Sequence, residues 1–502
     1  MGRLILLFFI VGLHASEVVH SGVLSASWSS PPFDLSDGLE AAQAPRVAIS
    51  SDGTKATAVW SRGASSSARV PQSASATISG GAAIWSTPIN LSVNASPNPY
   101  PQVSLSSDGT KAIAVWSGPS RVVQASSATI SGNLATWALP INLSGTLASS
   151  TPQVSFSDDG ARATAVWSWW NGSNYIIQAS SASIVGNLAT WASPIDISAL
   201  GSNAYDPDVS ISDDGSNVTA VWIRSNGSND IVQASSATIV GNVATWSTPI
   251  DLSTSGQNAT LPQISLSADG NKGLTVWSLQ SAGSAPTTYV AQASSAIMVG
   301  NSASWSTPVT LSGSSADRLA VRAFLSSDAS KATAIFTFKD GTIRTVQSSS
   351  ATIADNSAYW SAPVNLSVTG QDSAGANIGL SSDGTRATAI WLKVLGSSSV
   401  VQASSAEIIG NLASWTSPID ISTSSGSILS NTRLAVSAEG TVAAGIWQVG
   451  SPTMIKTATG LITYPVPTPP QPIPALSEWT QMVMMLMMIA TAGFYGWRIK
   501  RR

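Results

Sequence analysis

Residues 101–144 read PQVSLSSDGTKAIAVWSGPSRVVQASSATISGNLATWALPINLS, and this pattern returns at regular intervals along a chain of 502 residues. Its first landmark is a Trp separated from a Pro by two residues, and its second is the aromatic residue that ends an AVW-like run. The first landmark falls at Trp28, Trp85, Trp137, Trp191, Trp246, Trp305, Trp360 and Trp415. The second falls at Trp60, Trp116, Trp167, Trp222, Trp277, Phe336, Trp391 and Trp447. Self-similarity with a period of about 55 residues indicates a repeat architecture.

Each repeat is expected to form four short antiparallel strands, named a, b, c and d. Turn formers at Ser107–Thr110 separate strands a and b, and Gly132–Asn133 separates strands c and d. Strand b, Ala112–Trp116, is almost entirely apolar, which is typical of a strand covered on both faces. A single such sheet leaves apolar surface in water unless neighbouring sheets stack on it, so the units are expected in an array.

The phase of the repeats predicts how this array closes. The chain enters on a strand d at Trp28–Ser36, continues through seven complete units and ends on strands a, b and c. These last three strands are expected near Arg433–Ser437, Thr441–Trp447 and Thr453–Ala458. Because the first strand and the last three complete one sheet, the sequence predicts an all-β, eight-bladed β-propeller over residues 22–463 that is closed by its N-terminal strand.

The repeated Trp and Gln side chains are interpreted as structural. Of the 19 Trp residues, 15 occupy the two landmarks, where they are expected to form the core between blades. A Gln recurs after strand b, and because buried amides need partners, it is predicted to satisfy backbone groups between blades. The Gln residues are Gln124, Gln178, Gln233, Gln292, Gln347 and Gln402.

Composition argues against several function classes. Charged residues make up 10% of the chain, the net charge is −3 and the repeats carry no basic stripe, so nucleic-acid binding is not expected. The only His residues, His14 and His20, lie in or beside the N-terminal leader, and Cys is absent. No catalytic motif, metal site or cofactor is predicted, and the chain is not expected to be an enzyme.

An acidic residue recurs in the turn between strands a and b and is interpreted as a turn former. Its copies are Asp52, Asp108, Asp159, Asp214, Asp269, Asp328, Asp383 and Glu439. The Ser-Asp-Gly turn resembles the Ser-Pro-Asp-Gly turn of TolB-like and WD40-like propellers. It departs from the Asp-box of sialidases, in which a Trp follows the Gly by three residues, because here the separation is seven. The pairs Asp158–Asp159 and Asp213–Asp214 lack the roughly six to eight oxygen ligands of a calcium site.

Both ends of the chain carry expected targeting segments. Residues 1–16 combine one positive charge with a ten-residue apolar stretch, which predicts a signal peptide. Residues 464–474 are rich in Pro and predict a stiff linker. The 19 uncharged residues 479–497 are long enough for a transmembrane helix. A basic tail follows, at Arg498, Lys500, Arg501 and Arg502, and by the positive-inside tendency it places the propeller on the non-cytoplasmic side.

The C-terminal segment, residues 473–502, is similar to the IPTL-type sorting domain of Gram-negative bacteria. The motif residues are Ile473, Pro474, Ala475, Leu476, Ser477, Glu478 and Trp479, followed by the apolar helix and the basic cluster. The resemblance implies recognition by an exosortase-like membrane enzyme and sorting to the cell surface. The chain departs from the family at Ala475, where Thr is usual, and at Thr480, where Gly is common. A plain single-span anchor is the alternative interpretation.

The order of the strands also predicts at which end of the propeller each connection between strands lies. The a–b and c–d turns share one end, called the turn rim, and the b–c and d–a loops share the other, called the loop rim. Turns on the turn rim are uniform, whereas the separation of the strand-b landmark from the repeated Gln varies, from short at Trp116 and Gln124 to long at Trp277 and Gln292. Variable loops on a rigid scaffold are typical of binding surfaces, so the loop rim is the candidate site for a glycan or protein ligand.

Candidate ligand-binding side chains on the loop rim are aromatic or charged and fall outside the repeat pattern. They are Trp169, Trp170, Tyr175, Tyr100, Tyr205, Asp206, Arg224 and Tyr289, with Arg318, Lys339 and Asp340 as further candidates. The first hypothesis is an exported, membrane-anchored binding or adhesion module. The alternatives are a carbohydrate-active hydrolase or lyase that uses Tyr205 and Asp206, and a purely structural surface protein.

Overall fold

The computed structural model describes residues 20–21, 24–147, 151–281, 283, 287–423, 431–450, 453–464 and 466–467. These residues fall in two compact units. One unit spans Leu24–Thr463, and the other contains the antiparallel pair β1 (His20–Ser21) and β42 (Val466–Pro467). The expected signal peptide, transmembrane helix and sorting motif lie outside the described residues. Within the described part, no helix has the length and apolar character needed to cross a membrane.

The unit Leu24–Thr463 is an eight-bladed β-propeller, as predicted. Blades 1 to 4 contain, in chain order, β4 (Ala41–Ile49), β5 (Lys55–Ser65), β6 (Ala68–Ser79), β7 (Ala82–Trp85) and β8 (Ile89–Asn90); β9 (Gln102–Leu105), β10 (Lys111–Ser117), β11 (Val123–Ser131), β12 (Leu134–Trp137) and β13 (Ile141–Asn142); β14 (Gln153–Phe156), β15 (Arg162–Trp170), β16 (Tyr175–Val185), β17 (Leu188–Trp191) and β18 (Ile195–Asp196); and β19 (Ala204–Ile211), β20 (Asn217–Ser225), β21 (Asp230–Val240), β22 (Val243–Trp246) and β23 (Ile250–Asp251).

Blades 5 to 8 continue the same order. They contain β24 (Ala259–Leu266), β25 (Lys272–Gln280), β26 (Tyr289–Val299), β27 (Ser302–Trp305) and β28 (Val309–Thr310); β29 (Arg322–Leu325), β30 (Lys331–Asp340), β31 (Ile343–Ala354), β32 (Ser357–Trp360) and β33 (Val364–Asn365); β34 (Ser373–Leu380), β35 (Arg386–Leu395), β36 (Ser398–Ile409), β37 (Leu412–Trp415) and β38 (Ile419–Asp420); and β39 (Arg433–Val436), β40 (Val442–Val449) and β41 (Met454–Thr463) with β2 (Ser25–Trp28) and β3 (Phe33–Asp34). A 3-10 helix, Pro119–Arg121, lies between β10 and β11.

Strand d is split in two in every blade, where the sequence predicts one strand. In blade 2, both β12 and β13 pair with strand c, β11, and the residues Ala138–Pro140 between them leave the ladder. Because Pro has no N–H to donate, the Pro of the Trp landmark interrupts the strand. The fourth strand is therefore two short segments on the same edge.

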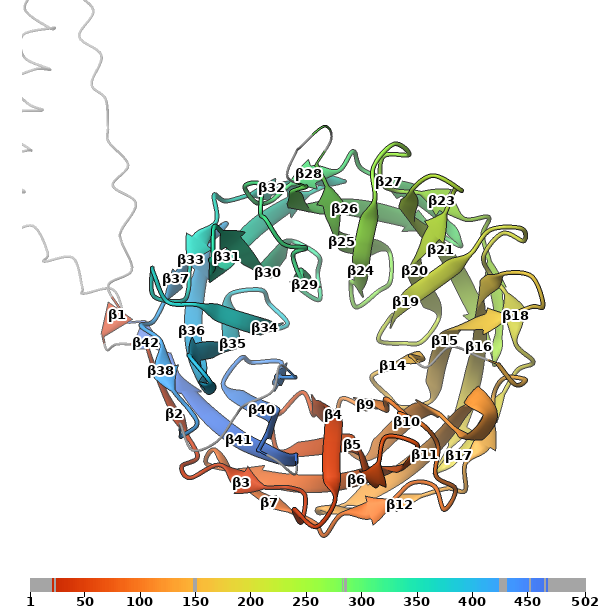
Figure 1. The fold of residues 1–502 in the computed structure, drawn as a ribbon, viewed down its shortest axis with the longest axis horizontal. Coiled ribbons are helices and arrows are strands. Elements are labelled where there is room, and N and C mark those ends of the chain that lie inside the picture. Colours follow the sequence, from red (N-terminus) through yellow and green to blue (C-terminus); the bar gives the residue numbers. More distant parts are fainter. Residues whose placement is uncertain are drawn as a thin grey trace, which may run out of the picture. The chain divides into compact units, whose positions relative to one another are not determined.

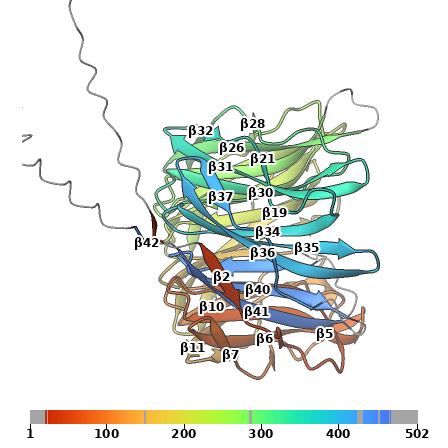
Figure 2. The same cartoon turned by 90° about the vertical axis from the view of Figure 1, so that its left-hand side faces the viewer.

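The N-terminal strand closes the ring, as the phase of the repeats predicts. β2 and β3 both pair with β41, which places the start of this unit beside its last strands (Figures 1 and 2). Trp28 pairs with Gly460, and a Cβ at that glycine would lie 2.8 Å from the Trp28 ring. Trp28 also packs in the same core cluster as the fully buried Trp447. Strand d of blade 8 thus comes from the N-terminal end of the unit, and strands a, b and c of that blade come from its C-terminal end.

The turn rim is joined by a closed ring of backbone hydrogen bonds. In each a–b turn, the N–H just before the acidic turn former donates to the carbonyl of the equivalent residue in the next blade, at 2.7–2.9 Å. The series runs through Ser51, Ser107, Asp158, Asp213, Ala268, Ser327, Ser382 and Ala438 and returns to Ser51. Because each of these bonds joins the same position in two successive blades, all eight blades are related by nearly the same rotation. The series of bonds therefore closes the eight blades into a circle.

The core lies between the blades, as expected for the repeated Trp residues. The aromatic residue of strand b is 0% exposed in all eight blades. The Trp of strand d is buried or partly buried and packs on core clusters that join strands of neighbouring blades. The apolar character of strand b therefore follows from burial on both faces.

The prediction for the repeated Gln residues was wrong. Gln402 accepts from the indole Nε1 of Trp391 at 3.1 Å and donates to Asp420 at 2.8 Å, so it bridges strands b, c and d within one blade. The same relay forms at Gln72, Gln124, Gln178 and Gln233. Because a buried indole N–H needs an acceptor, the amide is used within the blade instead of between blades.

Candidate binding surface on the loop rim

The three aromatic candidates that lie close together in the sequence, Trp169, Trp170 and Tyr175, differ in the residues they contact. Trp170 ends β15 and faces Tyr175, which begins β16, with ring centroids 5.2 Å apart and an interplanar angle of 59°. Trp169 turns away from this pair. Its Nε1 donates to the Thr146 carbonyl at 3.1 Å, and its ring packs on the core that joins blades 2 and 3. Trp170 and Tyr175 thus form an aromatic pair on the loop rim, and Trp169 packs against the preceding blade.

Four other candidates meet where blades 4, 5 and 6 adjoin. Tyr205 begins strand a of blade 4, and Asp206 follows it with a φ of 50°. Desolvation and a hydrogen bond with Asp230 raise the pKa of Tyr205, and desolvation and the Asp230 charge raise the pKa of Asp206. The Arg318 guanidinium lies 5.9 Å from the centroid of the Tyr289 ring, a cation–π arrangement. These residues form a compact group of two phenols, two carboxylates and one guanidinium.

The remaining candidates have other partners. Arg224 is paired with Asp251 of its own blade at 3.0 Å, and Lys339 is paired with Asp317 at 3.0 Å. Asp340 ends β30 at the tip of its hairpin. Tyr100, with a φ of 41°, lies close enough to Arg69 to affect its pKa. Among the described residues, no hydrogen bond or ion pair joins these four side chains to one another.

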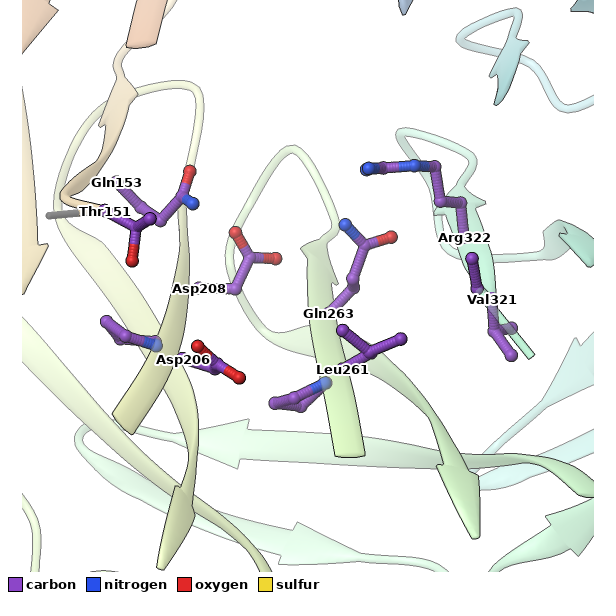
Figure 3. Close-up of a pocket in the computed structure, with 11 residues that line it drawn as sticks. Thr151, Gln153, Asp206, Asp208, Leu261, Gln263, Val321 and Arg322 are labelled. Carbon is purple, nitrogen blue, oxygen red and sulfur yellow. The ribbon is translucent and has the colours of Figure 1, made fainter. Parts of the chain in front are cut away.

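The central channel opens on the loop rim into a cavity of about 220 Å³. Figure 3 shows Asp208, Gln263 and Arg322, from the first strands of blades 4, 5 and 6, directed into this space. Asp206 and Leu261 lie at its edge. The cavity therefore joins the Tyr205 group to the channel.

A ring of eight polar residues surrounds the channel at this level. Each blade contributes the residue four positions before the Ser of its a–b turn. In blade order these are Arg46, Gln102, Gln153, Asp208, Gln263, Arg322, Asn377 and Arg433, called the channel ring. Blades 6, 7, 8 and 1 supply all three Arg and the Asn, whereas blades 2 to 5 supply the three Gln and Asp208. The ring is thus positive on one side and neutral to acidic on the other.

Hydrogen bonds connect some ring residues to the next blade. Arg46 Nε donates to Gln102 at 2.8 Å, and Asp208 accepts from the backbone N–H of Ile264 at 3.0 Å. With its amide oriented to satisfy its neighbours, Gln263 accepts from Arg322 Nη1 at 2.7 Å. In the two contacts made by a guanidinium, the acceptor is the neutral amide oxygen of a Gln. Among the described residues, none of the three ring Arg forms an ion pair.

The electrostatics of the ring reflect this lack of counter-charge. Burial and the charge of Arg322 lower the pKa of Arg46 to about 9, and burial with both other guanidiniums lowers the pKa of Arg433 well below its usual value. Burial also raises the pKa of Asp208 to about 6, against the opposing effects of the Ile264 N–H and Arg322. The three guanidiniums therefore lie close enough to repel one another.

The channel ring was not predicted from the sequence, although the repeats carry a signal for it. Strand a ends on apolar, variable, apolar and Ser positions in every blade, and the residue just before this ending changes between Arg, Gln, Asp and Asn. A variable polar position in an otherwise regular repeat indicates that its side chains face the channel instead of the apolar core between blades. The part of the chain that the structure describes has no group of three His, Cys, Asp or Glu side chains that could hold a metal ion.

Comparison with known proteins assigns this chain to no family. No family model and no curated protein matches the sequence. Among solved structures, the BP39L lectin from Burkholderia pseudomallei is 15% identical, with a TM-score of 0.47 over 78% of this chain and 100% of the lectin. Sqt1 from Chaetomium thermophilum is 10% identical, with a TM-score of 0.46 over 84% of this chain and 95% of Sqt1. The polysaccharide lyase Uly1 is 9% identical, with a TM-score of 0.44 over 74% of this chain and 89% of the lyase. These similarities assign no ligand or activity.

Proposed function

We propose that this protein is a non-enzymatic binding module that captures a glycan or protein ligand on its loop rim. The observation that carries the proposal is the difference between the two ends of the channel. On the turn rim, backbone groups are joined blade to blade. The loop rim carries a cavity lined by residues from strand a and the d–a loops, together with the Trp170 and Tyr175 pair and the Arg318 and Tyr289 pair. Such a combination of apolar and polar groups in a concave site favours ligand binding.

The test is a glycan and protein array probed with the full-length chain. Trp170→Ala and Tyr289→Ala remove exposed parts of two aromatic groups on the loop rim, and each is expected to weaken a true ligand signal at least tenfold. Tyr359→Ala is the matched control, because Tyr359 is 60% exposed on strand β32 at the outer edge of blade 6. The proposal fails if no ligand is found, or if the control variant weakens the signal as much as the rim variants do.

We also propose that the propeller is exported and held on the non-cytoplasmic side of a membrane. The support is the leader at residues 1–16, the apolar segment 479–497 and the basic tail. Fractionation of producing cells should recover the full chain with membranes and a chain ending at Pro472 in a soluble extracytoplasmic fraction. Recovery of both in the same fraction would reject the anchor. Mass spectrometry of the C-terminus separates the two forms of attachment, since loss of the tail favours exosortase-like processing and an intact tail favours a plain anchor.

One observation favours a second candidate, a carbohydrate-active enzyme. Tyr205 and Asp206 both have raised pKa values beside the cavity, and a carboxyl group whose pKa is raised can act as a general acid. Release of reducing ends from a polysaccharide, abolished by Asp206→Asn, would support this function. Unchanged turnover in the Asp206→Asn variant would exclude Asp206 as a catalytic residue.

A further inference from the structure

We propose that the channel ring binds the carboxylate of an acidic sugar, with the carboxylate on the Arg side and the sugar hydroxyls on the Gln and Asp side. The proposal rests on the binding function above and names the ligand class for the mouth of the channel. The ring residues lie on strand a and are different from the aromatic candidates of the loop rim.

Among the residues that the structure describes, Arg46 and Arg433 have no negatively charged partner, and Arg322 has only the longer-range attraction of Asp208, with which it forms no ion pair. Three Arg and one Asp leave the ring with a net charge of +2. Arg46 donates to Gln102 and to its neighbouring Pro45 carbonyl, and Arg433 donates to the Thr432 carbonyl at 2.7 Å. A guanidinium has five N–H donors and stays protonated at neutral pH. Several N–H donors of Arg46 and Arg433 therefore have no acceptor among the described residues, although each guanidinium lies close to other positive charges.

The position of the single carboxylate makes the ring directional. Asp208 belongs to blade 4 and Arg433 to blade 8, so the two residues are half a turn apart in a ring of eight blades. Arg46, in the adjacent blade 1, stands on the same side as Arg433, whereas Arg322, in blade 6, lies a quarter turn from both Asp208 and Arg433 and interacts electrostatically with both. An anion is attracted to that side and repelled by Asp208. A ligand that spans the mouth would thus bind in one orientation.

The rest of the site favours a sugar over a peptide. Gln153, Asp208 and Gln263 offer amide and carboxylate groups, which form hydrogen bonds with hydroxyls as donors and acceptors. Leu261, 42% exposed, and Pro262 supply an apolar surface for the C–H face of a sugar ring. The cavity of about 220 Å³ is lined by residues of blades 3 to 6, among them Arg322 but neither Arg46 nor Arg433. It is small beside the roughly 300–1,000 Å³ of drug-sized pockets, so it suits one sugar ring placed next to the Arg side.

The experiment is calorimetric titration of the full-length chain with glucuronate, glucose, inorganic sulfate and a glutamate peptide. Glucuronate is expected to bind at least tenfold more tightly than each of the other three. The double variant Arg46→Gln and Arg433→Gln should lose at least tenfold in affinity for glucuronate. Arg62→Gln is the control, because it removes an Arg of blade 1 that is paired with Asp37 and Glu40 outside the ring.

Each other outcome overturns part of the proposal in a recognisable way. If sulfate matches glucuronate, the site holds small anions only and the sugar assignment is wrong. If the glutamate peptide binds more tightly, the ligand is an acidic protein segment and the sugar assignment is again wrong. If the double variant binds as tightly as the parent while thermal unfolding shows both folded, the ring is not the site. Array ligands that depend on Trp170 or Tyr289 but ignore the double variant would preserve the proposed function and reject this inference.

Discussion

The buried Trp of strand b is the residue that sets the polar chemistry inside most blades. The acceptor for its indole N–H is an amide on the next strand, and that amide in turn donates to an Asn or Asp on strand d. The regular spacing of Trp and Gln predicts burial of both side chains. It does not predict their mutual contact, because the sequence separation between them changes from blade to blade and only the hairpin register brings them together.

A pair of matched variants tests the relay. Gln402→Leu leaves the Trp391 N–H and the Asp420 carboxylate without their partner, so we expect a loss of about 1–3 kcal/mol in the free energy of unfolding. Gln292→Leu is the control, because within the described residues the Trp277 N–H and the Gln292 carbonyl oxygen have no partner in the native protein. Chemical denaturation of the two variants gives the comparison. Equal losses would show that the relay contributes nothing beyond the burial of the side chain.

At the scale of the element, the a–b turn is the most regular part of the repeat. In blade 2, Asp108 accepts from the Ser106 hydroxyl at 2.7 Å and from the Thr110 N–H at 2.9 Å. Partial desolvation opposes ionisation, but these hydrogen bonds lower the pKa of Asp108 below its ordinary value. The prediction that the repeated Asp is a turn former is confirmed by these contacts. The split of strand d was not predicted, because alternating apolar residues continue across the Pro that interrupts the ladder.

The turn offers its own internal comparison. Asp108→Ala removes the acceptor that organises the turn, and we expect a loss of about 1 kcal/mol in the free energy of unfolding. Glu439→Ala, at the equivalent place in blade 8, should cost clearly less, since its carboxylate accepts no such hydrogen bond in the described residues. Thermal unfolding of both variants at pH 7 measures the difference. A larger loss for Glu439→Ala would contradict the role assigned to the turn acceptor.

At the scale of the whole molecule, the circle depends on the non-covalent strand at the N-terminus. The order of repeats predicts this closure, because an incomplete first unit and an incomplete last unit add up to one blade. The sequence does not predict the channel ring or the ring of backbone bonds on the turn rim, since both arise only when eight copies of one position meet around an axis. The period of the sequence shows which residues occupy equivalent positions in the repeat. Whether those residues face the core, a neighbouring blade or the channel depends on how the ring closes.

The Trp28→Ala variant tests the closure of the ring by the N-terminal strand. Trp28 packs against Gly460 and Trp447, so its truncation should lower the free energy of unfolding by about 3–5 kcal/mol. Hydrogen exchange of the β41 amides should accelerate, because β2 and β3 are attached to that strand from the far end of the chain. Trp246→Ala, in covalently continuous blade 4, is the control and should leave the exchange of β41 unchanged. Slow exchange of β41 in the Trp28→Ala variant would mean that the strand pairing alone holds the ring closed.

The turn rim also makes the stability of the whole ring depend on pH. Burial, with the nearby charges of Asp213 and Asp159, raises the pKa of Asp158 to about 6, although a hydrogen bond from Ser107 acts in the opposite direction. A raised carboxyl pKa means that the folded state prefers the protonated form, so the contribution of Asp158 to stability falls as the pH rises from about 4 through 6. Asp158→Asn keeps the backbone bond to Asp213 and removes the charge. We therefore expect a higher melting temperature than the parent at pH 8 and no difference at pH 4. A gain of the same size at both pH values would place the effect in packing instead of ionisation.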